Sequence, residues 1–202
     1  MKTDFDFLSS FSGTWQLLIG ALLATVGGFV ATQIEWFVER RRRQRNAALF
    51  LGELLSTLRG VIQLAAETKK IGEPFGPVTL RILRGAQREI DLYERNRENL
   101  LDLQDATLRA RIHTLVLRIS MPLESIFDSS QELDALKLDI HTRTLADSDR
   151  HEIERRMEAI RGRRDGSYDY MMQNVEQIRP MVTDLEPLAR HSFSAFHTAE
   201  QT

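Results

Sequence analysis

The stretch that decides the fold of this chain is residues 15–45, WQLLIGALLATVGGFVATQIEWFVERRRRQR. No Asp, Glu, Lys or Arg occurs from Phe7 to Ile34. The two tryptophans of the chain, Trp15 and Trp36, enclose the apolar part and lie roughly 32 Å apart along a helix that rises 1.5 Å per residue. This length matches the hydrocarbon core of a bilayer, which is about 30 Å thick.

We therefore predict a transmembrane helix over residues 14–38, because indole rings favour the headgroup level and one lies near each end. A cleaved signal peptide would have a positive leader and a shorter apolar part, whereas this leader carries Lys2 against Asp4 and Asp6. A core helix of a soluble protein would show one polar face, and no such face exists between Trp15 and Ile34.

The direction of the span follows from the arginines just after it, which are Arg40, Arg41, Arg42, Arg43 and Arg45. The positive-inside rule predicts that the short N-terminus, residues 1–13, lies outside and that the rest is cytoplasmic. The basic segment, residues 39–45, should also attract anionic lipid headgroups, with about 1 kcal/mol from each charge. The layout resembles that of small single-span bacterial proteins, so we expect a single-pass protein of the inner (cytoplasmic) membrane.

Small residues recur every fourth position in the span, at Gly20, Ala24, Gly28 and Thr32. This spacing lines them along one helix face, where a second span could approach closely. The face predicts packing in the membrane against a second copy or another membrane protein. The alternative is that glycine is simply frequent in such helices.

The part of the chain after the anchor is long enough for one domain with its own core. Residues 46–202 hold 21 basic and 25 acidic side chains, which gives a formal net charge of −4. An acidic domain is a poor nucleic-acid binder, because phosphate contacts need a basic surface. The chain has no cysteine, so disulfides, zinc thiolate sites and cysteine nucleophiles are excluded.

Helical spacing dominates this part, and no run of β-branched residues alternates with period two. The first helix should continue from the membrane and end before the turn-forming residues 72–77, GEPFGP. A second helix is expected from Val78 to about Asn99. The apolar stripe of the first helix consists of Ala47, Leu51, Leu54, Leu55, Leu58, Ile62 and Leu64.

A third helix should start after Asp105, whose carboxylate can accept from the exposed N–H groups of its first turn. Its apolar residues alternate at spacings of four and three, and Pro122 within it predicts a kink. They are Leu108, Ile112, Leu115, Ile119, Leu123 and Ile126. From Ser148 to about residue 187 the apolar phase stays continuous, which favours one bent helix, although Gly162, Gly166 and Pro180 favour two.

These patterns predict an all-α fold, in which the anchor is followed by an antiparallel helical bundle over residues 46–190 and a flexible tail over residues 191–202. Apolar stripes of this kind are typical of a core or of a seam between helices.

The sequence predicts no catalytic, cofactor-binding or metal-binding residue. Di-iron bundles use Glu-x-x-His, but no acidic residue stands three positions before any of the five histidines, which are His113, His141, His151, His191 and His197. The segment from His151 to Arg155, HEIER, begins like a zinc-protease motif but has arginine in place of the second histidine.

Two functions from different classes fit these observations. The first is a non-enzymatic interaction, scaffolding or oligomerising module held at the cytoplasmic face. The second is a ligand- or signal-responsive module, or an enzyme without a familiar motif, with a pocket between its helices. The best feature for the second is residues 168–172, YDYMM, which follow Arg163 and Arg164.

Overall fold

The computed structural model describes residues 5–142 and 147–193, with side chains from Leu18 onward except those of Ile19 and Asp147. All regular structure in these ranges is helical, as the sequence predicts. The chain divides into two compact units, Met1–Arg43 and Gln44–Thr202.

The first unit consists of the N-terminal part of α1, a helix that spans Phe5–Ile71 without a break at either predicted end of the span. Among the described residues, α1 is the one helix that is long and apolar enough to cross a membrane. Its apolar side chains are open to the surroundings, and Leu22 and Phe29 are 67% and 65% exposed. Exposure of so long an apolar surface is unfavourable in water and favourable in hydrocarbon.

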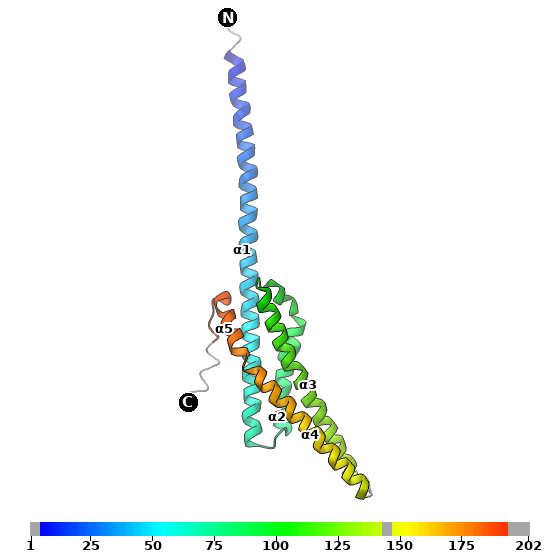
Figure 1. Cartoon of the computed structure of the whole chain (residues 1–202). Helices are drawn as coiled ribbons and strands as arrows, with labels where there is room; N and C mark the ends of the chain where they lie inside the picture. Colours follow the sequence, from blue (N-terminus) through cyan, green and yellow to red (C-terminus); the bar gives the residue numbers. More distant parts are fainter. Residues whose placement is uncertain (1–4, 143–146, 194–202) are drawn as a thin grey trace. The chain divides into compact units, whose positions relative to one another are not determined.

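The second unit is built from the C-terminal part of α1 and the elements that follow, α2 (Pro77–Arg95), η1 (Arg97–Asp102), α3 (Ala106–Thr142), α4 (Asp147–Val175) and α5 (Ile178–Ala189) (Figure 1). Side chains from each of these elements share one apolar core. Every residue of the predicted stripe of α1 is buried except Leu64, which is 53% exposed. The prediction for Leu64 is wrong because Ala65, three residues after Ile62, takes the inward position.

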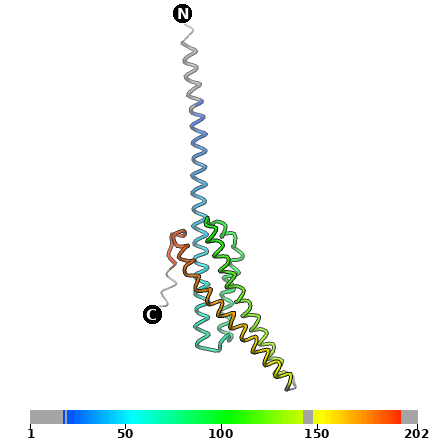
Figure 2. Tube along the Cα trace, viewed as in Figure 1, coloured from blue at the N-terminus to red at the C-terminus, as the bar shows by residue number. Residues whose placement is uncertain are grey.

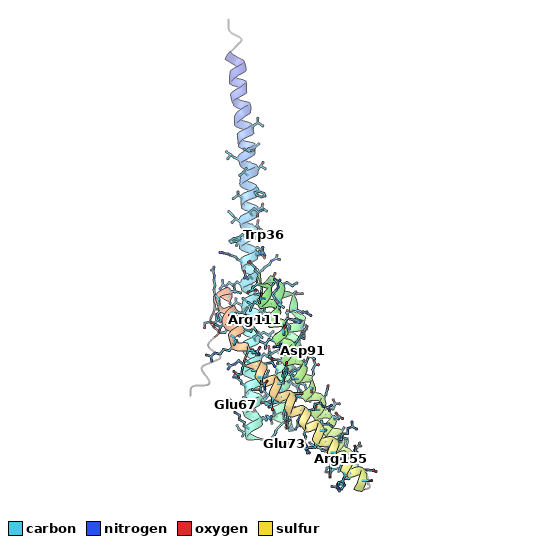
Figure 3. The ribbon with its side chains drawn as sticks, viewed as in Figure 1. Trp36, Glu67, Glu73, Asp91, Arg111 and Arg155 are labelled. Atoms are coloured by element: carbon cyan, nitrogen blue, oxygen red, sulfur yellow. The ribbon has the colours of Figure 1, made fainter. Side chains whose placement is uncertain are left out.

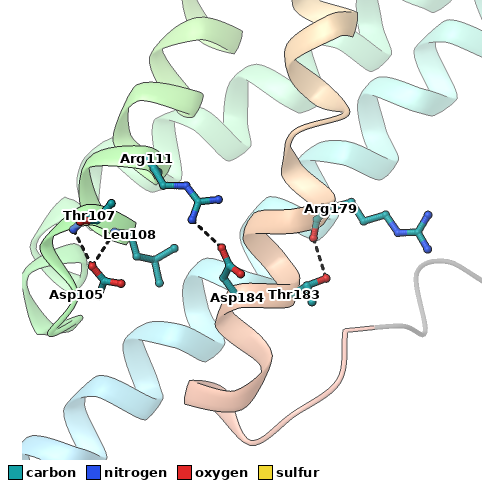
Figure 4. Close-up of polar contacts among 7 residues, drawn as sticks. All are labelled: Asp105, Thr107, Leu108, Arg111, Arg179, Thr183 and Asp184. Atoms are coloured by element: carbon teal, nitrogen blue, oxygen red, sulfur yellow. Dashed lines mark hydrogen bonds and ion pairs between the residues drawn. The ribbon is translucent and has the colours of Figure 1, made fainter.

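Helix α2 ends at Arg95, four residues earlier than predicted. The side-chain amide of Asn96 donates to the carbonyl of Leu92 at 2.8 Å, which satisfies a helix end in place of a further turn. The chain then forms the 3₁₀ helix η1. The predicted cap of α3 is confirmed, because Asp105 Oδ1 accepts from the amides of Thr107 and Leu108 at 2.8 and 3.1 Å (Figure 4).

The segment from residue 147 to residue 189 forms two helices, so the preference for one bent helix is wrong. The break lies at residues 176–177 and not at Gly162 or Gly166, which both lie inside α4. Pro180 explains its place, because a proline ring clashes with the carbonyl four residues earlier, here that of Glu176, and lacks the N–H that would bond to it. Proline is tolerated in the first turn of a helix, which is where Pro180 lies in α5.

Helix α4 runs back along α3, and the pair extends past the ends of α1 and α2 (Figure 1). Ser125 Oγ and Ser167 Oγ lie 2.9 Å apart, and farther along Glu132 accepts from Arg156 at 2.7 Å and Arg163 at 2.8 Å. The hydrogen bond from Arg156 lowers the pKa of the Glu132 carboxyl. A second, small core fills this hairpin and consists of Leu133, Leu136, Met157 and Ile160. Pro122 lies inside α3, and the kink there stays a prediction.

The end of α5 returns to α1, as the trace in Figure 2 shows. Phe193 is 1% exposed, so the packed part of the chain extends beyond residue 190, where the sequence predicts a flexible tail. The Phe193 ring lies directly over Gly52 of α1, where a Cβ atom would collide with it. The amide of Phe193 donates to Glu186 Oε1 at 2.9 Å, which fixes this segment against α5.

Replacing either of two glycines of α1 by alanine should therefore change the free energy of unfolding, in opposite directions for the two positions. Gly52→Ala should lower the free energy of unfolding by about 1–2 kcal/mol, because expelling a buried phenyl ring outweighs the gain of about 1 kcal/mol in helix propensity. Gly60→Ala should raise it by up to about 1 kcal/mol, because nothing lies within 4 Å of the added Cβ. Denaturant unfolding followed by near-ultraviolet circular dichroism measures both. Equal effects would contradict the close packing of Phe193.

Candidate functional site: the exposed face of helix α3

The structure describes the side chains of Trp36 and the arginines among the predicted membrane-interface residues. Trp36 is 58% exposed, and the guanidinium of Arg40 lies 5.1 Å from its ring centroid. Arg41 stacks in the same way on Phe37 at 4.6 Å. These pairs combine an apolar body with a charged end, which suits the headgroup level of a membrane. The side chain of Trp15 lies outside the described residues.

The predicted packing face of the span is uncovered in a single chain. Gly20, Ala24, Gly28 and Thr32 are all exposed, and a Cβ added at Gly20 or Gly28 would meet nothing within 4 Å. The hydroxyl of Thr32 donates to the carbonyl of Gly28 at 2.9 Å, so it needs no partner from another helix. The face is therefore open to close packing and offers no unsatisfied polar group.

Arg45 has a different environment from the other four arginines. Its Nε donates to the carbonyl of Ala189 at 3.2 Å, at the C-terminus of α5. An arginine there satisfies a helix-end carbonyl and favours the negative end of the helix dipole. Arg45 thus holds the last helix to the first, a role that the sequence pattern gives no sign of.

One depression of the second unit lies between α3 and α4. It has a volume of about 550 Å³ and is lined by Arg118, Met121, Pro122, Ser125, Arg163, Gly166, Ser167 and Tyr170. A second depression of about 430 Å³ lies between α3 and the start of α5, and Arg118 lines both. Together they follow α3 from Thr107 to Ser125, roughly 27 Å of helix at 1.5 Å per residue.

The α3 groove, by which we mean these two depressions together, has an apolar middle with charged sides. Met121 and Tyr170 of its lining are 68% and 48% exposed, and Leu117, one turn before Met121 on α3, is 41% exposed. Arg111, which is labelled in Figure 3, lies near one end of the groove. It donates to Asp184 of α5 at 2.8 Å (Figure 4). Arg118 makes no ion pair with any residue that the structure describes. Apolar surface around an unpaired cation is typical of a surface that binds another protein.

A third depression, of about 480 Å³, lies at the corner between η1 and α3 and is lined in part by Arg97, Arg109 and His113. His113 Nδ1 lies 3.1 Å from Tyr93 Oη, and His113 Nε2 lies 3.2 Å from Arg97 Nη2. A guanidinium only donates, so Nε2 is the acceptor and we assign the ring proton to Nδ1, which donates to Tyr93. His113 thus joins a buried phenol to an exposed cation.

Tyr93 should make the stability of the second unit fall in alkali. It is fully buried, and this burial together with the Glu94 carboxylate raises its pKa to about 12. The unfolded chain releases the phenol proton near pH 10 and the folded chain near pH 12, so the unfolded state binds fewer protons in between. The free energy of unfolding should then decrease by up to about 1.4 kcal/mol per pH unit over this window.

The comparison of the native chain with Tyr93→Phe tests this result through unfolding curves at pH 9, 10, 11 and 12. The slope should be shallower in the variant, which has no phenol at this position. Tyr168→Phe should also make the slope shallower, because burial also raises the pKa of Tyr168. If Tyr93→Phe leaves the slope of the free energy of unfolding against pH unchanged, ionisation of Tyr93 is not coupled to stability.

The tyrosines of residues 168–172 do not form one pocket. Tyr168 is 7% exposed and meets Phe75 edge to face, with 5.5 Å between the ring centroids. Lys69 lies 3.7 Å from the centroid of Tyr168, and Arg164 lies 4.2 Å from that of Phe75. Burial lowers the pKa of the Arg164 guanidinium. This cluster joins α4 to the turn after α1, whereas Tyr170 belongs to the α3 groove.

Metal chemistry has no assembled site in the part of the chain that the structure describes. No three His, Asp or Glu side chains there are grouped so as to hold a metal ion. The α3 groove offers shape, apolar surface and charge, which are the requirements of binding.

Comparison with protein-family models, with curated proteins and with solved structures gives no match.

Proposed function

We propose that the chain is a single-pass membrane protein whose cytoplasmic part is an antiparallel helical bundle that binds another protein without catalysing a reaction. The observation that carries this proposal is the α3 groove, with Met121 68% exposed beside Arg118 on a unit that otherwise has a closed core. A compact monomer gains nothing from holding such side chains in water. A binding surface gains their burial when its partner arrives.

The anchor supports the same proposal. The described apolar side chains of α1 before Arg40 suit hydrocarbon, and the arginines after them favour a cytoplasmic location for the second unit and contact with anionic headgroups. Confinement to a surface raises the local concentration of a binding module, so even a weak protein contact becomes effective there.

Single cysteines test the orientation cleanly, because the native chain has none. We expect Ser9→Cys to react with a membrane-impermeant maleimide on intact cells. Leu138→Cys, at a position that is 63% exposed, should react only after permeabilisation. The reverse labelling pattern would overturn the cytoplasmic assignment.

Crosslinking in native membranes tests the binding function. A photoreactive residue at Met121 should give defined adducts of higher mass, whereas the same residue at Val78, 62% exposed on α2, should give few. Equal adducts at both positions, or none at either, would contradict a binding role for the α3 groove.

A ligand-responsive module is the second candidate, and the corner around His113 favours it. Arg97 and Arg109 line an apolar depression there that is large enough for a small anionic amphiphile. Octanoate should then raise the melting temperature of the chain in nanodiscs, and less so in Arg97→Ala. If octanoate raises the melting temperature of neither protein, the ligand-responsive function is excluded and the interaction function is the remaining candidate.

A further inference from the structure

The corner between η1 and α3 carries two arginines whose charge no carboxylate of the described chain neutralises. Arg97 Nη2 donates to His113 Nε2 at 3.2 Å, and Arg109 Nη1 donates to the carbonyl of Leu103 at 2.6 Å. Neither arginine makes an ion pair with a described residue. A guanidinium has five N–H donors, so most donors of both side chains have no acceptor in the described chain and are left for an anion.

An apolar surface lies beside these cations. Leu101 is 75% exposed and lines the depression of about 480 Å³ together with Ala106 and Ala110 of α3. Glu98 also lines it, so two arginines and one glutamate give the lining a formal charge of +1 with His113 neutral. The corner therefore suits a ligand that carries one negative charge, hydroxyl groups that a carboxylate can accept from, and an apolar chain.

The corner lies at the end of the second unit at which α1 enters it. Helix α2 runs back along α1 after the turn at residues 72–76, and η1 and the start of α3 lie at that end (Figure 1). The four residues from Arg40 to Gln44 span at most about 14 Å in any conformation. This end of the unit therefore stays close to the arginines that follow the span, whichever way the unit turns.

We propose that this corner binds the headgroup of an anionic phospholipid of the bilayer that holds α1, a phosphodiester with one negative charge such as phosphatidylglycerol. Arg97 and Arg109 donate to the phosphate, for which the planar fork of a guanidinium is well shaped. Glu98 accepts from the hydroxyls of the headgroup, and Leu101 packs against an acyl chain. This inference rests on the membrane location in the proposed function and adds a lipid to the partners of the second unit.

A bilayer lipid is favoured over a soluble phosphate because it brings the anion and the apolar chain together. A soluble phosphate would leave Leu101 in water, whereas contact with a lipid removes this side chain from water. The anchor also holds the corner beside the bilayer, which supplies lipid at a high effective concentration.

The test uses full-length Leu101→Cys in nanodiscs, labelled with the fluorophore NBD, since the native chain has no thiol. Phosphatidylglycerol or phosphatidylcholine with a doxyl group on the acyl chain quenches the probe where the lipid contacts it. At equal doxyl content, the anionic lipid should quench the probe more strongly than the neutral lipid. The same probe at Val78→Cys, 62% exposed at the opposite end of α2, should be quenched by neither.

Adding Arg97→Gln to the Leu101 variant should raise the mole fraction of phosphatidylglycerol needed for half-maximal quenching roughly fivefold, because one phosphate contact is lost. Arg84→Gln is the matched control, since it removes an exposed arginine from the middle of α2 and should leave this mole fraction unchanged. Melting temperatures equal to that of the parent show that both variants are folded.

Each outcome decides the proposal. Stronger quenching by the anionic lipid that weakens in Arg97→Gln alone supports it. Equal quenching by the two lipids, or equal effects of the two arginine variants at matching melting temperatures, would overturn it. A shift of the probe's emission by inorganic phosphate in unlabelled phosphatidylcholine nanodiscs would assign the corner to a soluble anion instead. If the chain enters nanodiscs but neither lipid quenches the probe, the lipid corner fails and the membrane location stands. If the chain does not enter nanodiscs, both fail.

Discussion

Ile119→Asp should unfold the second unit or lower its melting temperature by roughly 6–20 °C. Ile119 is fully buried in the shared core, at the centre of the stripe of α3. A carboxylate there would lose its hydration without gaining a partner, which costs about 3–5 kcal/mol of a total stability of about 5–15 kcal/mol. A loss of 1 kcal/mol lowers the melting temperature of a domain of this size by about 2–4 °C. Thermal unfolding followed by near-ultraviolet circular dichroism measures the change.

The matched control is one residue away. Arg118→Asp introduces the same carboxylate on the exposed face of α3 and should change the free energy of unfolding by no more than about 0.5 kcal/mol. Similar losses from both substitutions would mean that the buried and exposed faces of α3 are wrongly assigned.

The cores of α1 and α3 could be predicted from sequence because their apolar residues follow the helical period over many turns. Asp105 was equally predictable, since its carboxylate bonds only to amides two and three residues away. Local patterns of this kind need no knowledge of the rest of the chain. The end of α2 was predicted less well, because the Asn96 side chain competes for the helix-end carbonyl of Leu92.

The division between α4 and α5 follows from the different costs of glycine and proline inside a helix. An interior glycine costs up to about 1 kcal/mol, which a long packed helix tolerates. A proline costs about 3 kcal/mol and blocks a specific hydrogen bond. The continuous apolar phase is real, because Met171 and Val175 of α4 and Val182 and Leu185 of α5 share one core. Phase alone does not report whether the backbone between such residues remains helical.

Two features of the second unit depend on contacts between distant residues. Arg45 reaches a carbonyl 144 residues away, and Phe193 packs on Gly52. No periodic pattern marks either. The exposed apolar residues at the α3 groove do have a sequence signal, because Leu117 and Met121 are apolar but out of phase with the buried stripe. Off-phase apolar pairs of this kind are worth noting when a helix has otherwise clear faces.

Introducing two arginines into the middle of the apolar part of α1 should release the protein from the membrane. We expect native chain to stay in the membrane pellet after washes with 1 M salt and with carbonate. At 1 M salt the screening length is only about 3 Å, so headgroup contacts alone would not retain it. In Leu22→Arg/Val26→Arg, each arginine costs about 2.5–3.5 kcal/mol at the bilayer centre, and the lost apolar residues add to this. The double variant should therefore appear in the carbonate wash or fail to accumulate.

Leu138→Arg is the matched control, because it places the same charge on an exposed apolar position of the second unit. It should remain in the pellet as the native chain does. Release of the native chain by carbonate would remove the transmembrane assignment. Retention of the double variant would show that residues other than the apolar part of α1 hold the protein at the membrane. The two results differ physically. The described apolar side chains of α1 are not buried in the protein and would face hydrocarbon in a membrane. A surface-bound domain would instead depend on charge and respond to salt.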